Sequence, residues 1–260
     1  MMAETPGISY RDAGVDIAAG TRAVALMRDA VRSTYGPEVL LGIGAFGGLY
    51  DAGALKGLAE PVLVASTDGV GTKVKIASAL GRFDTIGHDI VNHCVNDILV
   101  QGARPLFFLD YIAAERLDPV MAAAVEVAEL GCTLGDALLA PHRSYLTAVN
   151  TLQAAGIQIR GMAHITGGGL IDNPPRIFPP GLAARLYRDR WPAPPIFDLI
   201  QRSGRIADAE MAHVFNLGLG MLLILPAGQS AEALALLGED AWNVGEMIAR
   251  DAGPTVEIVR

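Results

Sequence analysis

The sequence predicts an α/β protein (α+β in the layout of its sheets), in which mixed sheet and helices alternate along both halves of the chain. Two features of composition support this class: the 260 residues are 51% hydrophobic, and they include 30 glycines but only 6% aromatic residues. The third is the patterning, because some stretches repeat apolar residues at helical spacing and others are short β-branched runs. We expect the halves to divide into domains of residues 1–132 and 133–260.

Each expected element follows from its local pattern. The run Pro61–Ala65 (PVLVA) is typical of a strand, and the helix expected over residues 84–103 stops at Gly102. Asp118 and Pro119 provide an N-cap and a first-turn proline for another helix. The expected helices cover residues 22–33, 84–103, 118–130, 141–155, 194–203 and 230–237. The expected strands cover residues 61–65, 105–112, 158–165, 217–226 and 254–259.

Charge and composition argue against several classes of partner. The net charge of −8 disfavours nucleic acid and anionic membranes, since both are polyanions. An acidic protein can still bind a phosphorylated metabolite with help from backbone N–H groups, a metal ion or a few basic side chains. The two cysteines, Cys94 and Cys132, have no CxxC spacing, which fits a reducing compartment. Met1–Ser9 has no basic apolar leader and the apolar stretches are too short to span a bilayer, so we expect a cytoplasmic protein.

The sharpest local feature is the run Ser66–Lys73 (STDGVGTK), which follows the strand expected at residues 61–65. Asp68 is a hard oxygen ligand of the kind Mg²⁺ prefers, the glycines let backbone N–H groups approach phosphate, and Lys73 can neutralise it. The pattern therefore fits a metal–nucleotide site, although its spacing is not that of a Walker A loop. The alternative is a surface turn with a solvated lysine.

The helix expected over residues 84–103 carries short polar side chains on an otherwise apolar sequence. Asp89 and Asn96 are seven residues apart and share a face, and Asp97 is next to Asn96. Short polar groups on a mostly buried helix need partners, and a metal ion shared with Asp68 would supply one. A solvated polar face is the alternative interpretation.

A second glycine-rich turn follows the strand expected at residues 158–165. Its residues are His164-Ile165-Thr166-Gly167-Gly168-Gly169, and a glycine loop leading into a helix is typical of anion binding. Tight turning alone also explains a glycine run, and a structural role suits His164 as well as a catalytic one. His93 is expected to be structural. No Ser-His-Asp, CxxC or HExxH pattern is present.

Taken in order, these motifs resemble the phosphoribosylformylglycinamidine cyclo-ligase family, also called aminoimidazole ribonucleotide synthetase. The resemblance covers nearly the whole chain. The matching segments are Ser9–Asp16, Phe46–Gly48, Ser66–Lys73, Asp84–Gly87, Cys94–Ala103, Pro105–Tyr111, Leu139–Pro141, Ala163–Gly169 and Phe215-Asn216.

The resemblance implies two related halves, with the N-terminal halves of two subunits pairing into a dimeric β-barrel. Residues 1–132 would form the ATP-site and dimerisation domain, and residues 133–260 a C-terminal domain that lacks its first elements. It also implies ATP and Mg²⁺ as cofactors and formylglycinamidine ribonucleotide as substrate. ATP would phosphorylate the amide oxygen, and the amidine nitrogen would then close the imidazole ring of de novo purine synthesis.

The resemblance also implies roles for individual residues. Asp68, Lys73 and Asp97 would be catalytic, with Asp68 and Asp97 as metal ligands. Cofactor-binding residues would be Asp16, Phe46, Gly47, Gly48, Thr67, Gly69, Gly71, Thr72, Asp89 and Asn96. The substrate or anion site would comprise His164, Thr166, Gly167, Gly168 and Gly169.

The largest departure from the family pattern is an absence. Family members carry a long segment between the positions of Gly131 and the Leu139-Ala140-Pro141 motif, and here Cys132 runs almost directly into that motif. That segment would help complete the substrate site. Two alternatives to an active cyclo-ligase therefore stay open: an impaired deletion variant that dimerises and binds nucleotide, and another ATP-using enzyme of the same superfamily.

Overall fold

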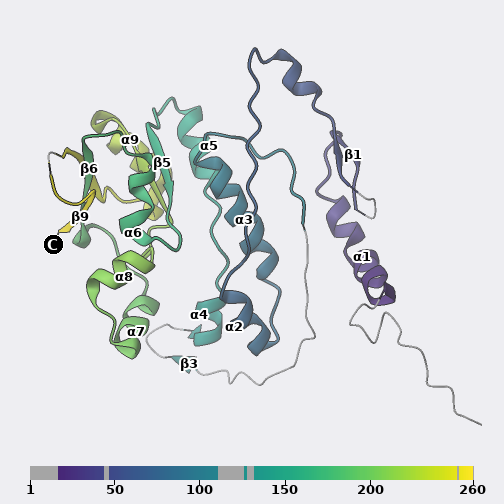
Figure 1. The fold of residues 1–260 in the computed structure, drawn as a ribbon, viewed down its shortest axis with the longest axis horizontal. Coiled ribbons are helices and arrows are strands. Elements are labelled where there is room, and N and C mark those ends of the chain that lie inside the picture. Colours follow the sequence, from purple (N-terminus) through teal and green to yellow (C-terminus); the bar gives the residue numbers. More distant parts are fainter. Residues whose placement is uncertain (1–16, 44–46, 111–125, 128–131, 251, 260) are drawn as a thin grey trace, which may run out of the picture. The chain divides into compact units, whose positions relative to one another are not determined.

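The computed structural model describes residues 17–43, 47–110, 126–127, 132–250 and 252–259, shown in Figure 1. The chain forms two compact units. The first comprises residues 1–63 with 106–118, and the second comprises residues 64–105 with 119–260. Each unit is described by itself.

The first unit contains a helix and a short hairpin. Helix α1 spans Ile17–Arg32, and strands β1 (Val39–Leu41) and β2 (Leu49–Tyr50) pair antiparallel before a 3-10 turn at Gly53–Gly57. The rings of Tyr50 and Phe107 pack with centroids 5.3 Å apart. The helix predicted at residues 22–33 is confirmed and starts earlier.

The second unit holds most of the helices. Their bounds are α2 Lys73–Leu80, α3 Ile86–Leu99, α4 Leu134–Leu139, α5 Leu146–Ala154, α6 Gly169–Asp172, α7 Pro195–Gly204, α8 Asp208–Val214 and α9 Ser230–Leu237. The predictions at residues 84–103, 194–203 and 230–237 are confirmed by α3, α7 and α9. Helix α3 packs against α2 and α5, which Figure 1 shows beside it.

The strands that the structure describes in the second unit form three small sheets. Strand β3 (Glu126–Val127) pairs with β4 (Cys132–Thr133), and β5 (Gly161–His164) pairs antiparallel with β7 (Met221–Ile224). In the third sheet β6 (Leu182–Tyr187) lies between antiparallel β8 (Gly245–Ala249) and parallel β9 (Val256–Val259). This combination confirms the predicted mixed sheet with helices. The described residues form no closed barrel.

Four sequence predictions need correction. Residues 61–65 and the described part of 105–112 are not strands, and their apolar side chains are exposed: Val62 is 82% and Leu109 69% accessible. A strand needs a hydrogen-bonded neighbour, and the described residues supply none to either run. Within the helix predicted at 118–130, residues 126–127 form β3, and the other residues lie outside the described ranges. Lys73, expected in a loop, begins α2.

The main core of the second unit lies between the sheets and helices α6 and α8. Ile165, Leu170 and Trp191 are buried there, and the Trp191 indole N–H donates to the carbonyl of Leu217 at 3.1 Å. A smaller cluster around Leu99, Val149 and Met162 joins α3 to α5 and β5. These clusters fix α3 and the end of β5, from which several polar side chains project. Among the described residues, no helix is long and apolar enough to cross a bilayer.

Candidate functional site

The segment of residues 140–145 is anchored to α3 by side-chain amides. Asn96 is fully buried, donates to the carbonyl of Arg143 at 2.8 Å and accepts from the N–H of Tyr145 at 3.0 Å. One turn earlier, Asn92 donates to the carbonyl of His142 at 2.6 Å. Backbone groups that a strand partner would normally satisfy are therefore satisfied by one face of the helix.

Closer to the N-terminus of α3 than these two amides, Asp89 forms an ion pair with Lys73. The Lys73 ammonium lies 2.8 Å from Oδ1 of Asp89 and donates to the carbonyl of Ala140 at 2.5 Å. The same carboxylate oxygen accepts the backbone N–H of His142 at 2.5 Å, and Asp89 is only 4% exposed. The structure thus places both predicted nucleotide-site residues in a contact that holds residues 140–145.

His164, at the end of β5, joins Asp97 to a second histidine. Its Nδ1 lies 2.7 Å from Oδ1 of Asp97, and its Nε2 lies 3.0 Å from Nε2 of His142. Burial lowers the pKa of His164, against the opposing effect of its hydrogen bond to Asp97. Burial, with the neighbouring His164 and His93, lowers the pKa of His142 to about 4. Both imidazoles are therefore neutral at pH 7.

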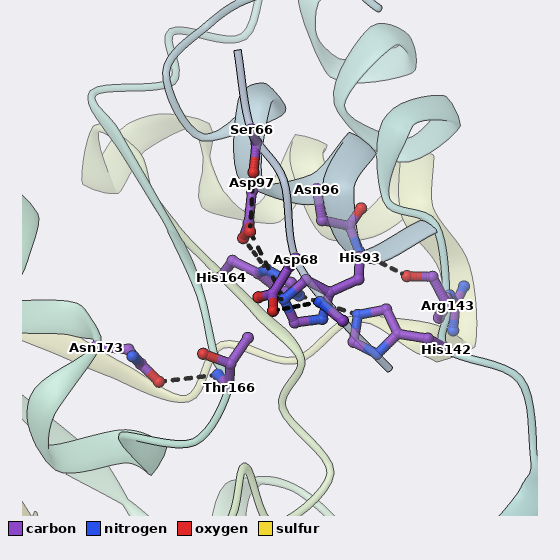
Figure 2. Close-up of polar contacts among 11 residues, drawn as sticks. Ser66, Asp68, His93, Asn96, Asp97, His142, Arg143, His164, Thr166 and Asn173 are labelled. Atoms are coloured by element: carbon purple, nitrogen blue, oxygen red, sulfur yellow. Dashed lines mark hydrogen bonds and ion pairs between the residues drawn. The ribbon is translucent and has the colours of Figure 1, made fainter. Parts of the chain in front are cut away.

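Asp68 reaches the same cluster from the segment before α2, as Figure 2 shows. Its Oδ2 lies 2.9 Å from Nε2 of His93, which is also 3.6 Å from Oδ2 of Asp97. Ser66 donates to Oδ2 of Asp97 at 3.5 Å. One donor atom from each of Asp68, His93 and Asp97 lies within 4.8 Å of the others. The two carboxylates predicted to share a metal are thus brought together, with His93 between them.

A cavity of about 270 Å³ lies beside the histidines. It is lined by His93, His142, Ile165, Thr166, Phe197, Val214, Phe215 and Asn216. A hollow of about 460 Å³ on α7 is lined by Pro195, Asp198, Gln201 and Arg202 and shares none of these residues. We therefore centre the candidate site on the smaller cavity, which adjoins the titratable groups.

The predicted anion turn has a packing role in the structure. The backbone N–H of Thr166 donates to Asn173 at 2.8 Å. Gly169 has a φ of +55°, and a Cβ there would lie 2.3 Å from the carbonyl oxygen of Ala212. Around Gly167 there is open space. Close packing accounts for Gly169, and the anion role of this turn stays a prediction.

The other predicted residues are dispersed. Thr67 lies exposed just before Asp68, and Gly69, Gly71 and Thr72 lie exposed between Asp68 and the start of α2. Gly47 and Gly48 belong to the first unit, and Asp16 and Phe46 lie outside the described residues.

Comparison with known proteins identifies the family. Residues 50–139 match the AIR synthase related protein, N-terminal domain, and residues 119–256 match the AIR synthase related protein, C-terminal domain. A phosphoribosylformylglycinamidine cyclo-ligase from Syntrophotalea carbinolica is 35% identical over 353 aligned positions, covering 99% of this chain and 100% of that protein. The chain belongs to the phosphoribosylformylglycinamidine cyclo-ligase family. Two further proteins of the same name support this assignment. The one from Geobacillus kaustophilus is 38% identical, covering 94% of this chain and 96% of that protein. The one from Burkholderia pseudomallei is 37% identical, covering 98% of this chain and 97% of that protein.

The cyclo-ligase alignment also contains a large gap. Its 353 positions exceed the 260 residues of this chain by 93, although nearly all of both proteins is aligned. A substantial stretch of the Syntrophotalea protein therefore has no counterpart here.

Sequence reasoning missed His142 and expected only a structural role for His93. Three of the five histidines of the chain meet at this site. They come from α3, the 140–145 segment and β5, so no short motif joins them. The only signal was the scarcity of histidine itself.

Proposed function

We propose that this protein catalyses the ATP-dependent conversion of formylglycinamidine ribonucleotide to aminoimidazole ribonucleotide, releasing ADP and phosphate, in the cytoplasm. The observation that carries the proposal is the alignment of 99% of the chain with a cyclo-ligase at 35% identity. Phosphorylation makes the amide oxygen a good leaving group, and attack by the amidine nitrogen then expels phosphate and closes the ring. The protein's contribution to such a reaction is mainly positioning and charge neutralisation.

The residues at the site fit a Mg²⁺ ion held with ATP. Asp68 and Asp97 offer carboxylate oxygens within reach of one another, and their side chains are 49% and 31% exposed, so the ion would keep several waters. When bound, Mg²⁺ would neutralise phosphate charge. Ser66 would orient Asp97, and residues 67–72, most of which are exposed, would present backbone N–H groups to the phosphates.

For Lys73 and Asp89, we propose a supporting role. Their ion pair and the buried Asn96 hold residues 140–145 against α3, which sets the position of His142 at the site. Direct contact of Lys73 with the nucleotide phosphates is the alternative, and it would require the ammonium to leave Asp89.

We propose that a second copy of the chain covers the exposed apolar runs at residues 61–64 and 106–109. Val62, Leu63, Phe107 and Leu109 are between 58% and 82% exposed. Such runs are typical of strands that lack a hydrogen-bonded neighbour, and a homodimeric barrel would supply neighbouring strands.

A second candidate function follows from the gap in the alignment. The two family matches overlap at residues 119–139, and we place the gap there, at the division that the sequence predicts between residues 1–132 and 133–260. Loss of a segment that helps to form the substrate site would leave a dimer that binds nucleotide without closing the ring. A third possibility, a different ATP-using enzyme of the superfamily, is disfavoured by the shared name of the relatives.

One experiment separates these candidates. The purified chain is mixed with ATP, Mg²⁺ and formylglycinamidine ribonucleotide, and formation of aminoimidazole ribonucleotide and ADP is followed. Ring closure that Asp68→Asn abolishes, and that Asp84→Asn on the exposed turn before α3 preserves, supports the proposal. ATP binding without turnover supports the impaired variant, and absence of both refutes the proposed nucleotide site.

A further inference from the structure

Three imidazoles from three separate elements converge beside the cavity. His93 comes from the middle of α3, His142 from the 140–145 segment and His164 from the end of β5. Their ring centroids are 5.1–5.4 Å apart, and one nitrogen from each lies within 4.8 Å of the others (Figure 2). Such convergence brings together three nitrogen ligands of the kind that Zn²⁺ prefers.

The spacing of two of these nitrogens already suits a bound ion. Two nitrogens bound to Zn²⁺ at about 2.0–2.1 Å in tetrahedral geometry lie about 3.3 Å apart. Nε2 of His142 and Nε2 of His164 are 3.0 Å apart. The remaining separation to His93 is at most 4.8 Å, which rotation of a partly exposed imidazole can close.

The surrounding groups orient these rings as an outer shell does in metal proteins. Oδ1 of Asp97 lies 2.7 Å from Nδ1 of His164, so the carboxylate accepts a hydrogen bond from the Nδ1–H. In this tautomer Nε2 of His164, which faces the other histidines, carries no proton. The backbone of His142 is fixed on both sides, because its N–H donates to Asp89 and its carbonyl accepts from Asn92. Asp68 lies 2.9 Å from His93. The ring of His164 and the backbone of His142 are therefore held in place without needing a metal to order them.

The cluster also leaves room for a further ligand. His93 and His142 both line the 270 Å³ cavity, next to Ile165 and Thr166. Three protein ligands with a fourth position open to a cavity are typical of catalytic zinc sites, whereas structural zinc sites are closed by four protein ligands.

We propose that His93, His142 and His164 form a binding site for Zn²⁺, with a fourth coordination position facing the cavity. This site is distinct in chemistry from the proposed Mg²⁺ site, since imidazole nitrogens favour zinc and carboxylate oxygens favour magnesium. Asp97 and Asp68 serve it by orienting the histidines. The proposal does not depend on ring closure, and binding is measured without ATP or substrate.

The first test uses the unaltered full chain after removal of metals with a chelator. Zn²⁺ is titrated calorimetrically, and Co²⁺ is then bound in its place and its visible spectrum recorded. We expect one equivalent of Zn²⁺, an intense four- or five-coordinate Co²⁺ spectrum, and no displacement by a large excess of Mg²⁺. A weak octahedral Co²⁺ spectrum, or binding that Mg²⁺ abolishes, would overturn the assignment to imidazole ligands.

Variants assign the ligands. His142→Ala should weaken Zn²⁺ binding by at least about 100-fold, and Asp97→Asn, which changes the group facing Nδ1 of His164, by about 10–100-fold. His88→Ala, at an exposed position on the same helix, and His213→Ala, whose histidine pairs with Asp172, are the controls and should bind as the parent does. Far-ultraviolet circular dichroism checks that each variant is folded. Parent-like affinity in folded His142→Ala would refute the site, and the Co²⁺ spectrum of the parent decides the matter if that variant does not fold.

Discussion

Replacing Lys73 by methionine would leave the carboxylate of Asp89 buried without the cation that faces it. The methionine retains most of the length and apolar volume of the lysine stem, so the loss is mainly that of charge. Asp89 would keep one donor, the backbone N–H of His142. The perturbation therefore tests whether this ion pair holds the 140–145 segment or whether Lys73 is available to a nucleotide.

The magnitude follows from the burial of the two groups. Breaking a buried pair by removing one partner costs about 3–5 kcal/mol. The Lys73 side chain is 21% exposed against 5% for Asp89, so water already screens part of the attraction, and we expect about 2–4 kcal/mol at pH 7.

Urea unfolding followed by tryptophan fluorescence measures this effect, since Trp191 and Trp242 both belong to the unit that contains α2. The control is Lys75→Met, at an exposed position on the same helix, which should change the free energy of unfolding by less than about 0.5 kcal/mol. Adding Asp89→Asn to Lys73→Met should recover part of the loss, because the unpaired charge disappears. If Lys73→Met is no less stable than Lys75→Met, the argument fails, and a raised KM for ATP would then favour a phosphate contact.

Three further predictions concern stability. Asn96→Ala should lower the free energy of unfolding by about 2–5 kcal/mol in urea unfolding, since two partly buried backbone groups lose the buried amide that pairs with them; a loss under about 0.5 kcal/mol would contradict this. Burial lowers the pKa of His142 from 6.5 to about 4, so the unfolded chain binds more protons between these values. The contribution of neutral His142 to the free energy of unfolding should therefore be fully present above pH 6.5 and fall by up to about 3 kcal/mol toward pH 4. His142→Gln should flatten this dependence of stability on pH in chelator-treated buffer, and an unchanged dependence would refute the reasoning. Gly169→Ala should lower the melting temperature by several degrees, because its Cβ meets a carbonyl, whereas Gly167→Ala should melt close to the parent; equal melting temperatures would count against the clash.

Local sequence patterns predicted the helices whose apolar spacing and capping residues all lie within the helical segment itself. Helix α9 occupies the predicted residues 230–237, and α3 and α7 differ only at their ends, because apolar spacing and capping signals lie within each segment. The run at 61–65 is as apolar as a strand, yet pairing depends on a neighbour that a local pattern cannot reveal. Strand β6 was not predicted, although β8 and β9 flank it on both sides.

The candidate site was predictable only where a motif carried it. Asp68 and Asp97 stand in recognisable runs, and the structure brings them within reach of the same histidine. His142 follows a proline in an unremarkable loop, and it reaches the site because Asn92 and Asp89 hold its backbone from about fifty residues away. Contacts between residues so far apart in the sequence produce no local sequence pattern. The contacts of Lys73 with Asp89 and Ala140 could not be predicted for the same reason.

The amide contacts from α3 have a consequence for how this protein tolerates changes in chain length. Because Asn92 and Asn96 set the register of the 140–145 segment directly, that register does not depend on the length of the chain before α4. An insertion or deletion ahead of Thr133 can therefore be absorbed without moving His142. For an engineer, this makes the stretch before α4 a suitable point at which to restore a longer loop, graft a reporter or open a permuted terminus.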